Sequence, residues 1–159
     1  MCHQQLPLIE KDNIQLIWQT GKYYFPQAKE AVEKLATDHI IAVSFINRMD
    51  LAYAMADIIV SRAGAIAISE ICAIGKPPIF IPLPTAAEDH QTKNANALVE
   101  NHAAIMVSNQ DAEDKLYDTI KNLIADKDRQ RELSANLLKL AKTNAAEKIA
   151  EEIIKLIKK

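Results

Sequence analysis

Three short polar segments carry the residue types best suited to binding a ligand, and each is associated with the end of a predicted β-strand. They span residues 45–49 (FINRM), 61–65 (SRAGA) and 88–94 (EDHQTKN). In open α/β sheets, ligands bind beyond the carboxyl ends of the strands. We therefore expect the three segments to meet at one edge of a sheet and to form a single site.

The segment 61–65 combines a tight turn with the start of a predicted helix over residues 64–73. Gly64 permits the turn, and the small side chain of Ala65 lets a ligand approach the backbone. The first amides of a helix have no acceptor inside it, so they attract phosphate or sugar oxygens. Here these amides belong to Ala65, Ile66 and Ala67.

Glu70 lies in the second turn of this predicted helix. A carboxylate at this place can accept two hydrogen bonds from a ribose diol. The position is equally ordinary for a solvated glutamate that the helix dipole favours. The spacing alone does not separate these two interpretations.

The last of the three segments opens a predicted helix over residues 90–100, with two amide side chains near its start. Gln91 and Asn94 share one face of this helix with apolar residues. Amides suit neutral sugar hydroxyls because they both donate and accept, although a polar first turn explains them as well. Asp89 and His90 could form an acid–base pair, but a capping aspartate beside an exposed histidine is the favoured interpretation.

The segment 45–49 gives a weaker signal. Phe45 and Ile46 end a predicted strand, so burial in the core is the simple interpretation. Backbone groups at this point can still read the edge of a base.

The composition suits a globular core and argues against several classes of function. About half of the 159 residues are apolar and the formal net charge is -2, so there is no overall basic field for a nucleic-acid backbone. With only three glycines, neither a GxGxxG nor a Walker loop can be written. The four histidines and two cysteines are too scattered for a metal site. No apolar run approaches the roughly 18 residues that span a bilayer.

Short β-branched runs alternate with helical runs, which predicts the α/β class and a parallel sheet covered by helices on both faces. The predicted strands span residues 14–18, 39–45, 58–61, 78–82 and 104–107. The predicted helices span residues 28–36, 49–56, 64–73 and 90–100, followed by a helical remainder that ends in an apolar stripe over 146–157. We expect Asn47 to cap the short helix, and Gly75 and Asn101 to take the left-handed conformation after the two helices that follow it.

A longer string joins these motifs. Residues 56–84 (ADIIVSRAGAIAISEICAIGKPPIFIPLP), followed by EDHQTKNA at 88–95, are similar to the C-terminal domain of the MurG family. Residues 17–22 (IWQTGK), 45–49 (FINRM) and 144–153 (NAAEKIAEEI) fit in the same order. The resemblance covers nearly the whole chain, and the combination of SRAGA…SE with DHQ…NA is more specific than any one piece.

The MurG family consists of undecaprenyldiphospho-muramoylpentapeptide β-N-acetylglucosaminyltransferases. The resemblance implies the GT-B architecture, in which two Rossmann-like domains face each other across a cleft. It implies an N-terminal domain that receives lipid I at the cytoplasmic face of the bacterial inner membrane, and a C-terminal domain that binds UDP-GlcNAc. Transfer would invert the anomeric carbon and yield lipid II without a metal or other cofactor. Membrane contact would come through the N-terminal domain.

The resemblance also implies roles for individual residues, all in substrate binding and none in catalysis. Ile46 would contact uracil through its backbone, with Phe45 beside it, and Glu70 would take the ribose hydroxyls. The start of the donor-binding helix would be formed by Ala65, Ile66, Ala67, Ile68, Ser69 and Glu70. The GlcNAc hydroxyls would meet His90, Gln91 and Asn94. Arg62 would help to hold the loop or the diphosphate.

Two features of the family are missing from the sequence. The Gly-Gly-Ser-type loop after the first strand of the domain is not found, and neither is the N-terminal domain with its proposed general base. We therefore expect residues 1–159 to be one incomplete donor-binding domain, not catalytically competent alone, whose first dozen residues are the tail of a helix. Without a first strand, the sheet should expose a pairing edge, which lowers stability or promotes self-association.

Two alternatives remain open at this point. A related GT-B glycolipid glycosyltransferase would use another UDP-sugar, and Gln91 and Asn94 alone do not exclude it. A non-catalytic α/β module would dock on a partner subunit instead of binding a nucleotide sugar.

Overall fold

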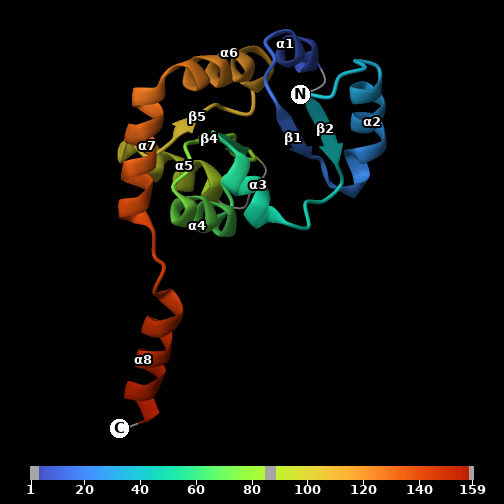
Figure 1. The fold of residues 1–159 in the computed structure, drawn as a ribbon. Helices are drawn as coiled ribbons and strands as arrows, with labels where there is room; N and C mark the ends of the chain where they lie inside the picture. Colours follow the sequence, from blue (N-terminus) through green and yellow to red (C-terminus); the bar gives the residue numbers. More distant parts are fainter. Residues whose placement is uncertain (1–3, 85–88, 158–159) are drawn as a thin grey trace.

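The computed structural model describes residues 4–84 and 89–157, and in this part of the chain it confirms the predicted α/β class (Figure 1). All five predicted strands are present. In chain order the elements are α1 (Leu6–Lys11), β1 (Leu16–Gln19), α2 (Gly21–Glu33), β2 (Ile40–Val43), α3 (Met49–Met55), β3 (Ile59–Ser61), α4 (Ala65–Ile74), β4 (Pro78–Phe80), α5 (His90–Glu100), β5 (Ile105–Met106), α6 (Ala112–Ala125), α7 (Lys127–Leu140) and α8 (Ala145–Ile157).

The strands form two parallel sheets and not one continuous sheet. β1 pairs with β2, with Leu16 opposite Ile40. β4 lies between β3 and β5 in the second sheet, with Pro78 of β4 opposite Ile59. Every pair is parallel, as the alternation of strands and helices predicts. Helix α1 is tied to α6 beside the first sheet, because the Gln5 side chain donates to the carbonyl of Ala112 over 3.1 Å (Figure 1).

The division leaves one edge of β1 and one edge of β3 without a partner strand among the described residues. On β1 the backbone N–H of Leu16 and, just beyond the strand, that of Thr20 donate to carbonyls on the β2 side. Because backbone groups of successive residues in a strand point to opposite edges, the backbone of Ile17 points to the open edge. β3 uses the backbone of Ile59 in the same way, so Val60 faces the other open edge. The side chains of Ile17 and Val60 are 42% and 40% exposed.

Helices cover both faces of the three-stranded sheet, as predicted. Phe80 of β4 is fully buried against α4 and α5, whereas its neighbour Ile79 points to the opposite face. Buried side chains form one cluster on each face of this sheet. The cluster around Phe80 contains Ile71, Cys72, Ala95, Leu98 and Leu137, and the cluster around Ile79 contains Leu116, Ile120, Leu123 and Leu133. This double cover explains why β4 reads as a continuous apolar run in the sequence.

The β1–β2 sheet is covered on one face only within the described residues. Leu16 and Ile40 pack with α1 and α2 in a third cluster. On the other face, Ile17 and Ile41 remain 42% and 54% exposed. The prediction of cover on both faces therefore holds for one sheet and not for the other.

Helix α2 begins seven residues earlier than the predicted start at residue 28, directly after β1. Gly21 has a φ of 73°, a left-handed conformation that glycine adopts without steric cost and that turns the chain straight from the strand into the helix. Pro26 lies within the helix. The predicted boundary was wrong because the apolar periodicity marks only the second half of the helix, whereas its first turns are exposed.

The predicted helix ends are partly confirmed. Gly75 ends α4 with a left-handed φ of 67°. Asn47 does not cap α3, because the capping position is Arg48 and no side-chain cap bond is made there within the described residues. Asn101 has a φ of -87°, and the left-handed residue is its neighbour His102 with a φ of 51°. The His102 N–H bonds to the carbonyl of Val99 over 2.9 Å, which places the left-handed position one residue later than predicted.

Helix α8 confirms the predicted stripe but leaves it without a packing partner among the described residues. It extends away from the rest of the chain after α7 (Figure 1). No residue of the helix is buried, and Ile149 and Ile153 are 62% and 52% exposed. In residues 4–84 and 89–157, no helix has both the length and the apolar character needed to cross a bilayer.

Candidate functional site

Hydrogen bonds between side chains and backbone join the predicted segments at the carboxyl ends of the strands. The Gln19 Oε1 atom accepts from the backbone N–H of Ile46 over 2.8 Å and so ties the end of β1 to the segment between β2 and α3. The Asn94 Nδ2 group donates to the carbonyl of Ala63 over 3.3 Å and so ties α5 to the turn before α4. Gln19 was not among the predicted site residues. The signal that could have identified it is a polar residue directly after an apolar strand.

The helix start predicted near Gly64 is present, although the conformation of Gly64 does not require a glycine. Gly64 is extended, with φ -70° and ψ 145°, and the first hydrogen bond of the helix runs from Ile68 N–H to Gly64 O over 2.9 Å. The preceding amides have no acceptor within the helix. They are those of Ala65, Ile66 and Ala67. Ile68 packs against the core, and the Ser69 hydroxyl donates to Ala65 O over 2.9 Å. The Ile68 side chain therefore serves the core and the Ser69 hydroxyl serves the helix, and the free amides at this helix start are those of Ala65, Ile66 and Ala67.

Glu70 is exposed on α4, and its Oε2 atom accepts a hydrogen bond from the hydroxyl of Tyr53 on α3 over 3.2 Å. The Tyr53 ring packs against the buried cluster that contains Ile71 and Phe80. Burial, and then the neighbouring Glu70 carboxylate, raise the pKa of Tyr53. The hydroxyl is therefore protonated at neutral pH and donates. Sequence reasoning missed Tyr53, because its helical spacing with Met49 indicates only a core face.

Gln91 and Asn94 each use one half of the amide to hold the backbone. The Gln91 Oε1 atom accepts from the backbone N–H of Leu83 over 2.9 Å. Asn94 holds Ala63 through its Nδ2 group. The Nε2 donors of Gln91 and the Oδ1 acceptor of Asn94 are therefore the halves that a ligand can use.

Asp89 and His90 do not show the capping arrangement that we favoured. Asp89 is left-handed with a φ of 57°, and its side chain makes no cap hydrogen bond within the described residues. His90 is the first residue of α5 and is exposed, as expected. In the described part of the chain, no group of three His, Cys, Asp or Glu side chains lies close enough together to hold a metal. Burial raises the pKa of the Cys72 thiol, which disfavours the thiolate.

Phe45 is 65% exposed, so the interpretation of this side chain as core was wrong. It lies with Ile46 on the wall of a mostly apolar hollow of about 340 Å³. The other lining residues are Ile17, Ile41, Val43, Asn47, Arg48, Leu51, Ala52 and Met55. Because Gln19 already engages the Ile46 N–H, a base in this hollow would meet the Ile46 carbonyl or displace the Gln19 amide.

Arg62 holds the loops that follow three strands. Its Nη1 group donates to the carbonyls of Ile81 and Pro82, over 3.1 and 3.3 Å. It also donates to the Asn109 Oδ1 atom over 2.8 Å. Arg62 therefore connects the ends of β3 and β4 to the loop after β5, which fits the loop-holding role.

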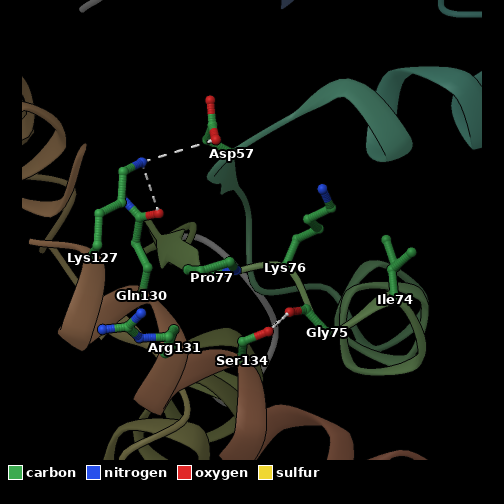
Figure 2. A pocket seen from close by; sticks show the side chains of 9 residues that line it. All are labelled: Asp57, Ile74, Gly75, Lys76, Pro77, Lys127, Gln130, Arg131 and Ser134. Atoms are coloured by element: carbon green, nitrogen blue, oxygen red, sulfur yellow. Dashed lines mark hydrogen bonds and ion pairs between the residues drawn. The ribbon is translucent and has the colours of Figure 1, made fainter. Parts of the chain in front are cut away.

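A larger open cleft of about 490 Å³ lies away from these residues (Figure 2). Its lining residues are Asp57, Ile74, Gly75, Lys76, Pro77, Lys127, Gln130, Arg131 and Ser134. Asp57 and Pro77 precede β3 and β4, so the cleft lies at the amino ends of the strands, opposite the predicted site. Figure 2 shows Lys127 paired with Asp57, and the Ser134 hydroxyl bonded to the carbonyl of Gly75; the ion pair spans 4.0 Å. Two other cations of the lining bond to groups outside the cleft, Lys76 to the carbonyl of Ala54 and Arg131 to Asp128.

The chain belongs to a known family of glycosyltransferases. Residues 1–153 match the glycosyltransferase family 28 C-terminal domain. This match covers nearly the whole chain and confirms the class that the three segments indicate.

Curated relatives and a solved structure narrow the resemblance to MurG. The chain is 50% identical over 148 residues to the UDP-N-acetylglucosamine--N-acetylmuramyl-(pentapeptide) pyrophosphoryl-undecaprenol N-acetylglucosamine transferase of Bacteroides thetaiotaomicron, covering 92% of this chain and 40% of the relative. It is 44% identical over 154 residues to the protein of the same name from Flavobacterium psychrophilum, covering 97% of this chain and 41% of that relative. The crystal structure of Acinetobacter baumannii MurG superposes with a TM-score of 0.80 at 26% identity, over 97% of this chain and 48% of that chain. The chain thus spans about two-fifths of the length of these curated relatives.

Proposed function

We propose that this chain supplies the donor-binding half of an inverting glycosyltransferase that moves GlcNAc from UDP-GlcNAc to lipid I and forms lipid II. The observation that carries the proposal is a set of three hydrogen bonds beyond the carboxyl ends of the strands. Asn94 bonds to Ala63 in the segment before α4, Tyr53 bonds α3 to Glu70 of α4, and Gln19 bonds Ile46 to the end of β1. The names of the relatives supply the donor and the acceptor.

Each part of the donor has a matching group in this arrangement. The hollow beside Phe45 and Ile46 would take the uracil, and Glu70 would take the ribose diol. The amides of Ala65, Ile66 and Ala67 would meet the diphosphate and sugar. The GlcNAc hydroxyls would meet His90, the Gln91 donors and the Asn94 acceptor.

The start of α4 would also assist departure of the nucleotide. Negative charge grows on the diphosphate as the bond to the sugar breaks, and the amides and dipole at a helix start stabilise such charge. The acceptor hydroxyl must lose a proton to a base. None of the site residues described above is placed to act on an acceptor, so we propose that the rest of the transferase supplies that base, the lipid I site and the contact with the cytoplasmic face of the inner membrane.

The open sheet edges support a further part of the proposal. We infer that the donor domain includes one more parallel strand between β1 and β3, and that residues 1–159 are therefore incomplete as a domain. The backbone groups of Ile17 and Val60 point to these open edges and are available to pair with such a strand.

Titration of the chain with UDP-GlcNAc by ligand-observed NMR tests the proposal, with UDP-glucose as the comparison ligand. Glu70→Ala should weaken binding, because the ribose loses its carboxylate. Glu100→Ala is the matched control, since Glu100 is an exposed glutamate at the far end of α5.

The outcomes distinguish the UDP-GlcNAc site from a site for another donor and from a docking module. Selective binding of UDP-GlcNAc that Glu70→Ala weakens and Glu100→Ala does not would support the donor site. Equal binding of UDP-glucose would favour a related transferase with another donor. Absence of binding both in this chain and in a chain extended by the relatives' preceding strand would refute the donor assignment and favour a docking module.

A further inference from the structure

A hydrogen bond between Tyr53 and Glu70 links α3 to the carboxylate of the proposed ribose site. Among the described residues it is the one such link. The Tyr53 hydroxyl lies 3.2 Å from Glu70 Oε2. The Tyr53 ring is partly buried against the core, whereas Glu70 is exposed on α4. A fixed donor therefore meets a side chain that solvent would otherwise leave to sample several rotamers.

A ribose diol needs a carboxylate that is already oriented. An ionised carboxylate offers about four lone-pair sites on its two oxygens, so one bond from Tyr53 leaves ample capacity for two ribose hydroxyls. Ordering a free glutamate costs rotamer entropy, and a contact that orders it before the ligand arrives reduces the cost of binding. Tyr53 can perform this task without touching the nucleotide.

Helix α3, which carries Tyr53, is anchored to its neighbours. It begins at Met49, three residues after Ile46, and Gln19 holds the Ile46 backbone. The far end of α3 is held by Lys76, whose Nζ donates to the carbonyl of Ala54 over 3.1 Å. Tyr53 thus belongs to a short helix that is held at both ends, with its hydroxyl aimed at α4.

We propose that Tyr53 is a positioning residue that orients the Glu70 carboxylate for the ribose of the nucleotide sugar. This inference rests on the proposed function, because it requires Glu70 to bind ribose. It adds a residue outside the predicted donor-binding set and predicts which part of the donor loses recognition when the hydroxyl is removed.

The test compares two ligands across a set of variants of the chain. The ligands are UDP-GlcNAc and its 2′,3′-dideoxyribose analogue, and affinity is measured by calorimetry or NMR. Tyr53→Phe removes the hydroxyl and keeps the buried ring. Tyr117→Phe is the matched control, because Tyr117 donates to the Asp12 carboxylate near the amino end of β1. Circular dichroism checks that each variant is folded.

Tyr53→Phe should weaken UDP-GlcNAc about three- to fivefold, at the lower end for one hydrogen bond because 3.2 Å is long for a hydroxyl donor. It should leave the dideoxy analogue unchanged and should have no effect in a Glu70→Ala background. Equal weakening of both ligands, or full additivity with Glu70→Ala, would show a packing role and overturn the inference. If Glu70→Ala itself treats the two ligands alike, or neither the unsubstituted chain nor the chain extended by the relatives' preceding strand binds either ligand, the ribose assignment fails first and this inference falls with it.

Discussion

Gly75→Ala should destabilise the chain strongly, because two separate costs meet at this residue. Gly75 ends α4 with a φ of 67°, a conformation that costs an L-residue about 1–2 kcal/mol. An added Cβ would also lie 2.7 Å from Cγ and 2.8 Å from Cδ2 of Leu138 on α7. Forcing an extra carbon into a packed contact costs typically about 1–3 kcal/mol.

The sum is about 2–5 kcal/mol if Leu138 stays in place, and the strain alone remains if Leu138 moves. Leu138 is 53% exposed, so its side chain has room to rotate. Leu138→Ala in the Gly75→Ala background separates the costs, because it removes the clash and leaves the strained φ. Gly64→Ala is the control. Gly64 has an ordinary φ of -70°, and no heavy atom of the described residues lies within 4 Å of its added Cβ.

Thermal unfolding followed by circular dichroism measures these changes. For a chain of this size, about 2–5 kcal/mol corresponds to a fall in Tm of roughly 5–20 °C. Gly64→Ala should change Tm by no more than about 2 °C. A Tm for Gly75→Ala equal to that of the unsubstituted chain would refute both the left-handed conformation and the contact with Leu138.

Three further outcomes follow from particular contacts. Hydrogen bonding from Lys121 and then Tyr117 lowers the pKa of Asp12 from its ordinary value of 3.8, so Asp12→Asn should destabilise the chain at pH 7. This difference in urea midpoint should shrink as pH falls below about 4, where the unsubstituted carboxylate also protonates. Gln91→Glu keeps an acceptor for the Leu83 N–H but loses the amide donors, so affinity for UDP-GlcNAc should fall about two- to tenfold by calorimetry with Tm nearly unchanged. Ile17→Lys, which places a charge at the open edge of β1, should shift sedimentation toward the monomer if this edge drives self-association.

The sequence predicts the strands better than their arrangement, for a physical reason. Each strand is a run of β-branched residues, and this signal is local. Whether β1 and β3 pair with each other depends on contacts between distant segments, so the run IQLIW looks the same in a closed sheet and at an open edge. The start of α2 was missed for a local reason, because Gly21 was not identified as a left-handed turn that leads straight into a helix.

The site was predictable where the chemistry lies in the backbone or in residue type. Gly64 and the amides after it follow directly from the position of a turn before a helix. Tyr53 could not be predicted in the same way. Its ring packs against the core, and the proposed role belongs only to the hydroxyl. The partner of this hydroxyl, Glu70, is 17 positions away along the chain.

The two amides of α5 show how structure refines a prediction made from residue type. As free side chains, Gln91 and Asn94 would each offer donors and acceptors to any sugar hydroxyl. Their bonds to Leu83 and Ala63 fix opposite halves, so Gln91 presents donors and Asn94 presents an acceptor. A hydroxyl can serve both at once, whereas a group that only accepts would satisfy Gln91 alone. Selectivity at this site should therefore depend on hydroxyl groups that donate, and replacing such a hydroxyl of the sugar by fluorine should cost the Asn94 contact first.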